Sequence, residues 1–289
     1  MKDIVSDFTQ LCNRNKDGSF DTQAKRVREL KAMGKLLVGE LGFRKMRARS
    51  IKPKHIVALV EHWKAQGIAV STIKTRMSYV RWWARKKDRQ GVVYKTNAQY
   101  GISNRQYVTN ESKAWRLDES KLEGVKSEHV RISIKLAAVF GLRTEEVLKI
   151  QPGIADQGCE LWLKASWCKG GKQRFVPIRT EQQRDILNEA KAIAGKGSLI
   201  PPSKSYSQHQ RHYYYALRTV GLIKPHGLRH QYAQDRYFEL AGWHCPVMGG
   251  ARRKELTREQ KQIDKRARKE LALELGHERI NVVANYIGV

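Results

Sequence analysis

Four short stretches in the second half of the sequence carry Arg, Lys, His and Tyr side chains that could act together on a phosphate ester. They are GLRTEE (141–146), CKGGKQR (168–174), PHGLRH (225–230) and LGHERINVVANY (275–286). In-line attack on phosphorus places extra negative charge on the non-bridging oxygens, and planar guanidinium groups bind such oxygens through paired hydrogen bonds. Arg143 and Arg229 are the candidates for this role. No cluster of carboxylates, which a metal-dependent nuclease would use to hold Mg²⁺, stands out in the sequence.

The same chemistry needs a nucleophile, and Tyr286 is the candidate. It follows His277 by nine residues. A phenol with an ordinary pKa of about 10 needs a neighbouring group to take its proton at neutral pH. A single Tyr in such a position more often packs against a core, so the spacing carries weight only together with the other three stretches.

Together, the four stretches resemble the catalytic motifs of the tyrosine recombinase, or phage-type integrase, family. That family has Gly-Leu-Arg followed three residues later by Glu, a hairpin lysine before a strand that ends Val-Pro-Leu, a His-x-Leu-Arg-His motif, and Leu-Gly-His followed nine residues on by Tyr. The resemblance covers roughly residues 125–289. The residues at the family's positions are Arg143, Glu146, Lys169, His226, Arg229, His230, His277 and Tyr286.

The resemblance implies that Tyr286 attacks the DNA backbone and forms a 3′-phosphotyrosine. It also implies that His226 assists the proton transfer from this Tyr and that His277 donates a hydrogen bond to the phosphate. A covalent phosphotyrosine preserves the energy of the broken bond. A second DNA end can therefore reverse the step without ATP.

The departing 5′ oxygen needs a proton, and the resemblance assigns this general acid to Lys169 on a mobile hairpin. Lys172, three residues further on, is the alternative and fits the family position less well. Glu146 is expected to support the first arginine, and His230 is expected to orient the pocket. The resemblance implies neither a metal nor another cofactor.

The resemblance implies a site-specific DNA recombinase that integrates or excises a prophage or other mobile element. Two alternatives stay open on the sequence. One is a type IB topoisomerase-like enzyme that relaxes DNA as a monomer. The other is a DNA-binding accessory protein without catalysis.

The charge of the chain independently indicates a nucleic acid partner. The 289 residues include 56 Lys and Arg against 28 Asp and Glu, a net charge of +28 with a pI near 10.1. Such an excess repels itself unless a polyanion neutralises it, and double-stranded DNA is the expected partner. Neither a membrane-spanning apolar run nor a signal peptide is recognisable, so no membrane partner is expected and we expect a protein of the bacterial cytoplasm and nucleoid. The four cysteines are scattered and are expected to be reduced.

More than half of the excess charge lies in residues 1–100, where apolar residues recur at helical spacing over 22–41, 52–67 and 70–87. The pattern predicts a small helical domain, which the resemblance identifies as a core DNA-binding domain of the SAM-like type. The last of these helices mixes basic residues with Tyr and Trp, so that one face can pack while another contacts phosphates. The basic residues predicted to contact DNA are Lys74, Arg76, Arg81, Arg85, Lys86 and Lys87.

The remainder is predicted to be a linker (101–115) and a catalytic domain (116–289). Two strand-like runs at 159–167 and 173–178, joined by paired glycines, predict a β-hairpin. Helices are expected over 128–140, 181–194 and 207–220, around 228–240, and from 266 to the end. The fold class is therefore mostly α with a small β-hairpin (α+β).

The connection between Arg229 and His277 is longer than in compact members of the family, which indicates an insertion at 241–268. It is interpreted as a DNA-contacting arm, a partner-contacting helix or a solvated excursion, and the sequence leaves all three open. The resemblance implies a homo-oligomer, a tetramer on DNA, with an accessory DNA-bending or directionality factor as a possible partner. Few residues follow Tyr286, so we expect either that protomers associate through other surfaces, such as the insertion, or that the tail has been dispensed with.

Overall fold

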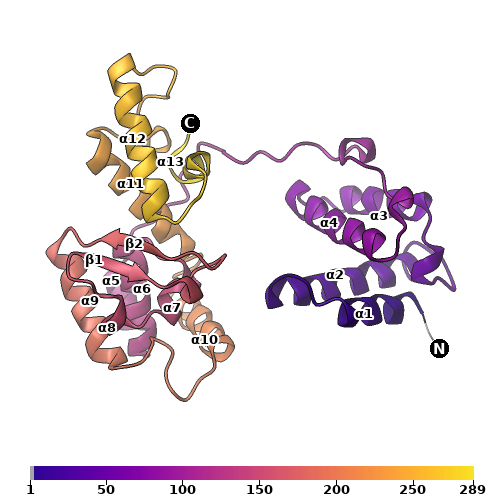
Figure 1. The fold of residues 1–289 in the computed structure, drawn as a ribbon, viewed down its shortest axis with the longest axis horizontal. Helices are drawn as coiled ribbons and strands as arrows, with labels where there is room; N and C mark the ends of the chain where they lie inside the picture. Colours follow the sequence, from indigo (N-terminus) through magenta and orange to yellow (C-terminus); the bar gives the residue numbers. More distant parts are fainter. Residues whose placement is uncertain (1–2) are drawn as a thin grey trace. The chain divides into compact units, whose positions relative to one another are not determined.

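The computed structural model describes residues 3–289, which form two compact units divided between Gln106 and Tyr107. Helices dominate both units, and the second also contains a small antiparallel sheet (Figure 1). The predicted fold class, mostly α with a small hairpin, is confirmed. Within residues 3–289, no helix combines the length and the apolar character needed to cross a membrane.

The first unit is built from helices that the sequence largely predicted. They are α1 (Ile4–Arg14), α2 (Phe20–Val38), α3 (Pro53–Ala65) and α4 (Val70–Lys86). Pro53 opens α3 at the position where its missing N–H costs nothing. Ser19 caps α2 by accepting a hydrogen bond from the backbone N–H of Thr22.

Helix α1 was not predicted, although the sequence contains its signal. Ile4, Phe8, Leu11 and Cys12 recur at helical spacing, and all four are buried. Figure 1 shows α1 beside α2, and Gly34 of α2 leaves room for that approach, because a Cβ there would lie 3.3 Å from Ile4. Helix α1 therefore completes the core of the first unit.

The second unit contains more, and shorter, elements. They are α5 (Glu119–Glu123), α6 (Glu128–Phe140), α7 (Thr144–Lys149), α8 (Pro152–Ala155), β1 (Glu160–Leu163), β2 (Arg174–Pro177), α9 (Glu181–Ala194), α10 (Tyr206–Thr219), α11 (His226–Ala241), α12 (Arg258–Glu274) and α13 (Ala284–Ile287). Strands β1 and β2 pair antiparallel, with Glu160 opposite Pro177 and Leu163 opposite Arg174. The predicted hairpin is thereby confirmed, but its first strand is shorter than the predicted run 159–167, because Ala165–Trp167 form a 3₁₀ turn.

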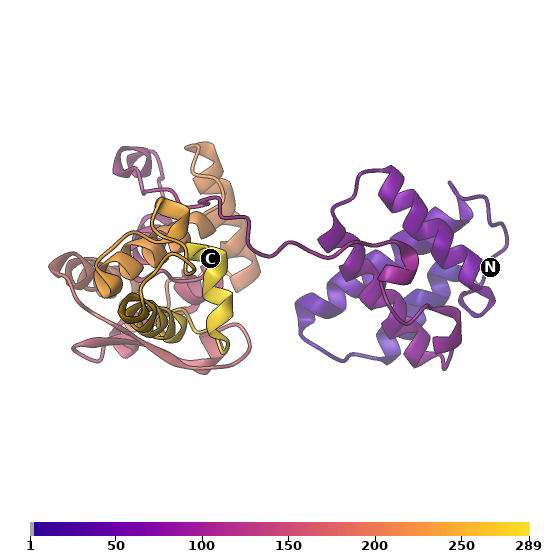
Figure 2. The ribbon, with the colours of Figure 1, turned by 90° about the horizontal axis from the view of Figure 1, so that it is seen from above.

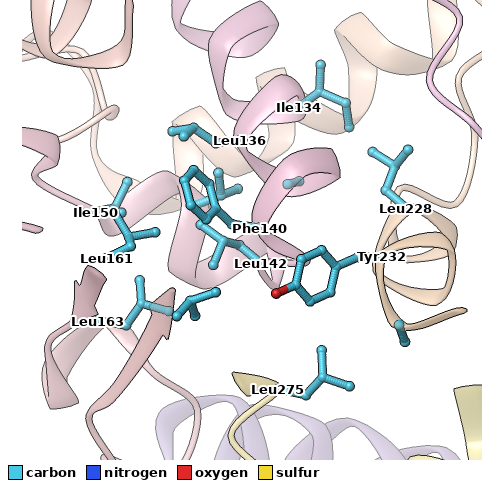
Figure 3. Close-up of a cluster of buried hydrophobic side chains, with 14 of the residues drawn as sticks. Ile134, Leu136, Phe140, Leu142, Ile150, Leu161, Leu163, Leu228, Tyr232 and Leu275 are labelled. Atoms are coloured by element: carbon cyan, nitrogen blue, oxygen red, sulfur yellow. The ribbon is translucent and has the colours of Figure 1, made fainter. Parts of the chain in front are cut away.

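Helix α6 runs through the core of this unit. Figure 3 shows its side chains Ile134, Leu136 and Phe140 between hairpin residues on one side and residues of α11 on the other. The hairpin contributes Leu161 and Leu163 to this cluster. Packing against α6 thus holds the hairpin and α11, which carry different sequence motifs, in one rigid body.

Gly141 ends α6 and turns the chain towards Arg143. Its φ is +61°, a left-handed conformation that suits glycine, and a Cβ there would lie 2.5 Å from the ring of Tyr232. The close approach of α11 therefore depends on this glycine. It also leaves the Gly141 carbonyl facing α11.

The C-terminal region differs from the helix predicted from 266 to the end, and that prediction is wrong in its bounds. Helix α12 begins at Arg258, where Thr257 and Gln260 form a capping box. It ends before Gly276, which has a φ of +64°. A 3₁₀ turn (Ile280–Val283) then leads into α13, which lies beside α11 (Figure 2).

Residues 241–268, predicted as an insertion, form a loop with a 3₁₀ turn (Pro246–Met248) followed by the first part of α12. A buried network anchors this helix. Tyr237 and Arg268 both donate to Asp264, and Arg268 also donates to the carbonyl of Gly288 at 3.0 Å. Helix α12 is thus tied directly to the segment that carries Tyr286.

Candidate active site

Tyr286 lies in the middle of a cluster of basic side chains. It is only 6% exposed, and its hydroxyl accepts a hydrogen bond from Nε of Arg229 at 3.3 Å. Its ring centroid lies 4.7 Å from that of His230, 5.5 Å from that of His277 and 6.0 Å from that of His226. Packing in the unit therefore gathers residues from α11, α13 and the turn after α12 around one phenol.

Arg229 is the most deeply buried cation of the cluster, at 1% exposure. Besides Tyr286, it donates to the carbonyl of Gly141 at 2.5 Å and to that of Leu275. Burial lowers the pKa of Arg229 to about 10, which leaves it protonated at neutral pH. A guanidinium has five N–H donors, so two remain without a partner among residues 3–289.

Arg143 precedes α7 and is held by Glu146. Its backbone N–H and its Nη1 both donate to this carboxylate at 2.7 Å, and only that one guanidinium N–H has a partner in the described chain. Glu146 is completely buried. Burial raises its pKa, but hydrogen bonds and charge from Arg174, together with the charges of Arg229 and Arg143, outweigh this and lower the pKa to about 2. Glu146 is therefore ionised and fixes the direction of Arg143.

The histidines of the cluster are neutral at neutral pH. Burial, with the charges of Arg229 and Arg143, lowers the pKa of His277 to about 3 and also lowers the pKa of His226. Burial and His226 lower the pKa of His230 to about 4. Nε2 of His277 and Nδ1 of His230 are buried without a hydrogen-bond partner in residues 3–289. An anion bound among these side chains would supply the partners that the imidazoles lack.

Lys169 is not drawn into the cluster. It is exposed in the turn before Gly170 and Gly171, and it makes no hydrogen bond or ion pair within the part of the chain that the structure describes. Lys172, the alternative, forms an ion pair with Glu278, next to His277. The other residues predicted from the sequence, Arg143, Glu146, His226, Arg229, His230, His277 and Tyr286, come together. Among residues 3–289, no three His, Cys, Asp or Glu side chains are arranged to hold a metal ion.

Two residues of the site were missed by the sequence analysis. Arg174, on β2, is buried and binds Glu146 through two hydrogen bonds of 2.8 and 2.7 Å. Gln234, on α11, donates to the carbonyl of Tyr286 at 3.1 Å. The alternation of a strand offers a signal for Arg174. Arg174 and Val176 are two positions apart and share the buried face, whereas Phe175 between them is exposed, so the pattern places a charge on the face that points to the core.

Comparison with protein-family models decides the family. A model described as phage integrase, N-terminal, matches residues 1–93, and a model described as integrase matches residues 104–235. The chain belongs to the phage integrase family. This integrase is a tyrosine-type site-specific DNA recombinase, as the resemblance predicted, and neither the topoisomerase nor the non-catalytic alternative is favoured. His277 and Tyr286 lie beyond the matched residues.

Solved structures of similar fold agree with this assignment. A lambda integrase dimer bound to a COC′ core site has a TM-score of 0.62 at 18% identity, over 96% of this chain and 76% of that one. The XerH site-specific recombinase has a TM-score of 0.59 at 17% identity, over 98% of this chain and 80% of that one. The Tn1549 transposon integrase has a TM-score of 0.57 at 13% identity, over 99% of this chain and 94% of that one. At these identities the likeness shows the fold alone. A comparison with curated protein sequences finds no match for the integrase.

The predicted DNA-contacting residues of α4 lie in different environments. Arg85, Lys86 and Lys87 are exposed at the end of the helix, and Lys74 is half-buried. Arg76 pairs with Glu29 and lies over the ring of Trp63, and Arg81 donates to the carbonyl of Tyr94 at 3.4 Å. The Tyr and Trp side chains of α4 are buried in the core. DNA contact by these basic residues stays a prediction, with the three at the helix end the most accessible.

The lowered histidine pKa values predict that acid weakens the fold of the integrase. His209 and His230 are buried and have a pKa of about 4, against 6.5 when unfolded. Between these values the unfolded chain binds protons that the folded chain does not. The free energy of unfolding should therefore fall as pH falls, by up to about 1.4 kcal/mol per pH unit for each imidazole. Urea denaturation between about pH 7 and pH 5 measures this slope.

A His209→Phe variant serves as the control for this pH dependence. Both ring nitrogens of His209 lack a hydrogen-bond partner in residues 3–289, so the Phe ring breaks no hydrogen bond there. The variant should show a smaller slope. A free energy of unfolding that stays constant over this pH range in the wild-type protein would contradict the buried, neutral state of these histidines.

Proposed function

We propose that this integrase cuts and rejoins DNA by transesterification at Tyr286. The observation that carries the proposal is the hydrogen bond of 3.3 Å between the hydroxyl of Tyr286 and the buried guanidinium of Arg229, beside imidazole nitrogens of His230 and His277 that lack a partner within residues 3–289. The phenol oxygen attacks the scissile phosphorus, the bond to the 5′ oxygen breaks, and a 3′-phosphotyrosine forms. Attack by a 5′ hydroxyl on this ester reverses the step and releases Tyr286. No ATP is needed, because one ester replaces another.

The remaining residues take roles that follow from their charge state. Arg143 and Arg229 bind the non-bridging oxygens through their free N–H groups. His277 donates a hydrogen bond to the same phosphate. His226 is neutral at neutral pH and its ring lies 6.0 Å from that of Tyr286, so it can accept the proton of this phenol.

Lys169 protonates the departing 5′ oxygen in this proposal. Its turn contains two glycines with positive φ, Gly170 at +84° and Gly171 at +69°, and a Cβ at either would meet nothing within 4 Å. The hairpin tip is thus free of packing, and we expect bound DNA to bring Lys169 to the leaving group. Glu146 and His230 support the cluster around Tyr286.

Double-stranded DNA is the proposed partner of both units, since the net charge of +28 is neutralised by phosphates. We propose that residues 1–100 act as a core DNA-binding domain, that 101–115 act as a linker, and that 116–289 catalyse the reaction. A solved lambda integrase is described as a tetramer bound to a Holliday junction. A homotetramer on DNA, working at the nucleoid in the bacterial cytoplasm with an accessory DNA-bending or directionality factor, is the assembly that we propose here.

Capture of the covalent intermediate tests the function. The full chain is mixed with a pool of nicked duplexes of randomised sequence, in which the cleaved end diffuses away and rejoining is prevented. Protein that keeps DNA after denaturation is isolated, and the attached DNA is sequenced. We expect attachment to a 3′ phosphate at a selected sequence, with chelator present. Nicking that depends on Mg²⁺ and leaves no attached DNA would refute the proposal.

A further inference from the structure

Arg174 is a buried arginine whose hydrogen bonds reach several parts of the active site. Its Nη1 and Nη2 bind the two oxygens of Glu146 at 2.8 and 2.7 Å, and its Nε donates to the carbonyl of Glu274 at 2.8 Å. Nη1 also lies 3.5 Å from Sγ of Cys168. Most of its donors are therefore satisfied inside the protein, as a buried guanidinium requires.

The carboxylate of Glu146 connects Arg174 to Arg143. Each of its oxygens accepts one hydrogen bond from Arg174 and one from Arg143, whose backbone N–H and Nη1 both donate at 2.7 Å. If Arg174 moved, this carboxylate would lose two of its four donors. It would then no longer be fixed in the direction that orients the guanidinium of Arg143.

A second path leads from Arg174 to His277. Gly276 precedes this histidine with a φ of +64°, and a Cβ on Gly276 would lie 2.9 Å from Cδ of Arg174. The stem of Arg174 thus packs directly under the turn, while its Nε holds the last carbonyl of α12. The His277 backbone N–H closes the same turn on the carbonyl of Ala272 at 2.8 Å. Arg174 therefore supports the turn at Gly276 that positions His277.

A third connection is covalent. Arg174 is the first residue of β2 and follows Lys169 by five residues. Its side chain also contacts Cys168, which directly precedes Lys169, so Arg174 holds both ends of the turn that carries this lysine. The tip of the hairpin is exposed, whereas its base is fixed by this arginine. We therefore expect Lys169 to move only with the exposed tip, while the base of the hairpin stays in place.

We propose that Arg174 is a positioning residue that joins the segments carrying Arg143, Lys169 and His277 into one phosphate-binding surface. This inference rests on the proposed function. We place Arg174 behind the residues that contact DNA, because four of its five N–H donors are already used inside the protein. A lysine cannot replace it, since an ammonium cannot bind both oxygens of Glu146 in the plane of the carboxylate and also reach Glu274.

The test uses the full chain with Arg174→Lys and the duplex selected from the randomised pool. At saturating DNA, we expect the rate of covalent attachment to fall about 10- to 100-fold, because small displacements of positioned groups have effects of that size. The dissociation constant for DNA should be unchanged. Arg184→Lys is the matched control, since Arg184 pairs with Asp156 at 2.7 Å in the same unit without contacting the cluster, and it should attach DNA at the wild-type rate.

A second substrate separates positioning from a general loss of structure. In a methylphosphonate, a methyl group replaces one non-bridging oxygen of the scissile phosphate, so there is less charge for Arg143 to stabilise. The defect of Arg174→Lys should be smaller on this substrate. An equal loss on both substrates, or attachment of the normal duplex at the wild-type rate, would overturn the inference. Absence of attachment by the wild-type protein would instead overturn the proposed function.

If Arg174→Lys does not fold, the double variant Arg174→Gln with Glu146→Gln takes its place, because it removes both buried charges together. Thermal denaturation identifies the folded variants. The same slower attachment is expected from the double variant, and a wild-type rate in this folded protein would overturn the inference equally well.

Discussion

Replacing Tyr286 by Phe is expected to abolish covalent attachment of DNA while DNA binding is retained. The substitution removes the hydroxyl oxygen that attacks phosphorus and leaves the ring among His226, His230 and His277. The lost hydrogen bond to the buried guanidinium of Arg229 costs about 2 kcal/mol of stability, below the roughly 5–15 kcal/mol by which a typical domain is stable, so the fold should persist. Denaturing gels on the selected duplex measure attachment, and fluorescence anisotropy of labelled duplex measures binding.

Tyr213→Phe is the matched control for this experiment. Tyr213 lies fully buried in the same unit, and its hydroxyl has no hydrogen-bond partner in residues 3–289. The control should attach DNA as the wild type does. Attachment by Tyr286→Phe, or an equal loss in Tyr213→Phe, would show that the hydroxyl of Tyr286 is not the nucleophile.

The second large effect is expected from Arg229→Lys. A lysine keeps the positive charge but cannot hold Tyr286 and the carbonyls of Gly141 and Leu275 while also binding a phosphate. Loss of a preorganised donor to the developing charge should slow attachment by about 10²- to 10³-fold. A buried carbonyl left without a donor should also lower the free energy of unfolding by about 2 kcal/mol.

Arg131→Lys controls for the structural part of this effect. Arg131 also donates to a backbone carbonyl, that of Val125 at 2.6 Å, and lies outside the cluster around Tyr286. This control should lose some stability and no attachment rate. Single-turnover attachment and urea denaturation measure the two quantities separately. A wild-type rate of attachment in Arg229→Lys would show that the guanidinium of Arg229 is not needed for catalysis.

Features set by short stretches of sequence were predicted well. Helices α6 and α9 have the predicted bounds, and the paired glycines correctly predicted where the hairpin lies in the sequence. Helix α12 shows the weakness of the same approach, because its capping box at Thr257 was overlooked within a segment dense in charge. These features depend on periodicity, caps and turn residues within a few positions of each other, and such signals can be read without knowing the tertiary structure.

The identity of the chemical groups was also determined by the sequence, since Arg143, Arg229, His277 and Tyr286 belong to recognisable motifs. What only the tertiary structure decided is how these groups are paired and charged. Arg174 binds Glu146 from 28 positions away, and Arg229 meets Tyr286 from 57 positions away. The physical reason is that packing around α6 removes these side chains from water. Burial then lowers the pKa of His277 and leaves each guanidinium only the partners that the folded chain brings within reach.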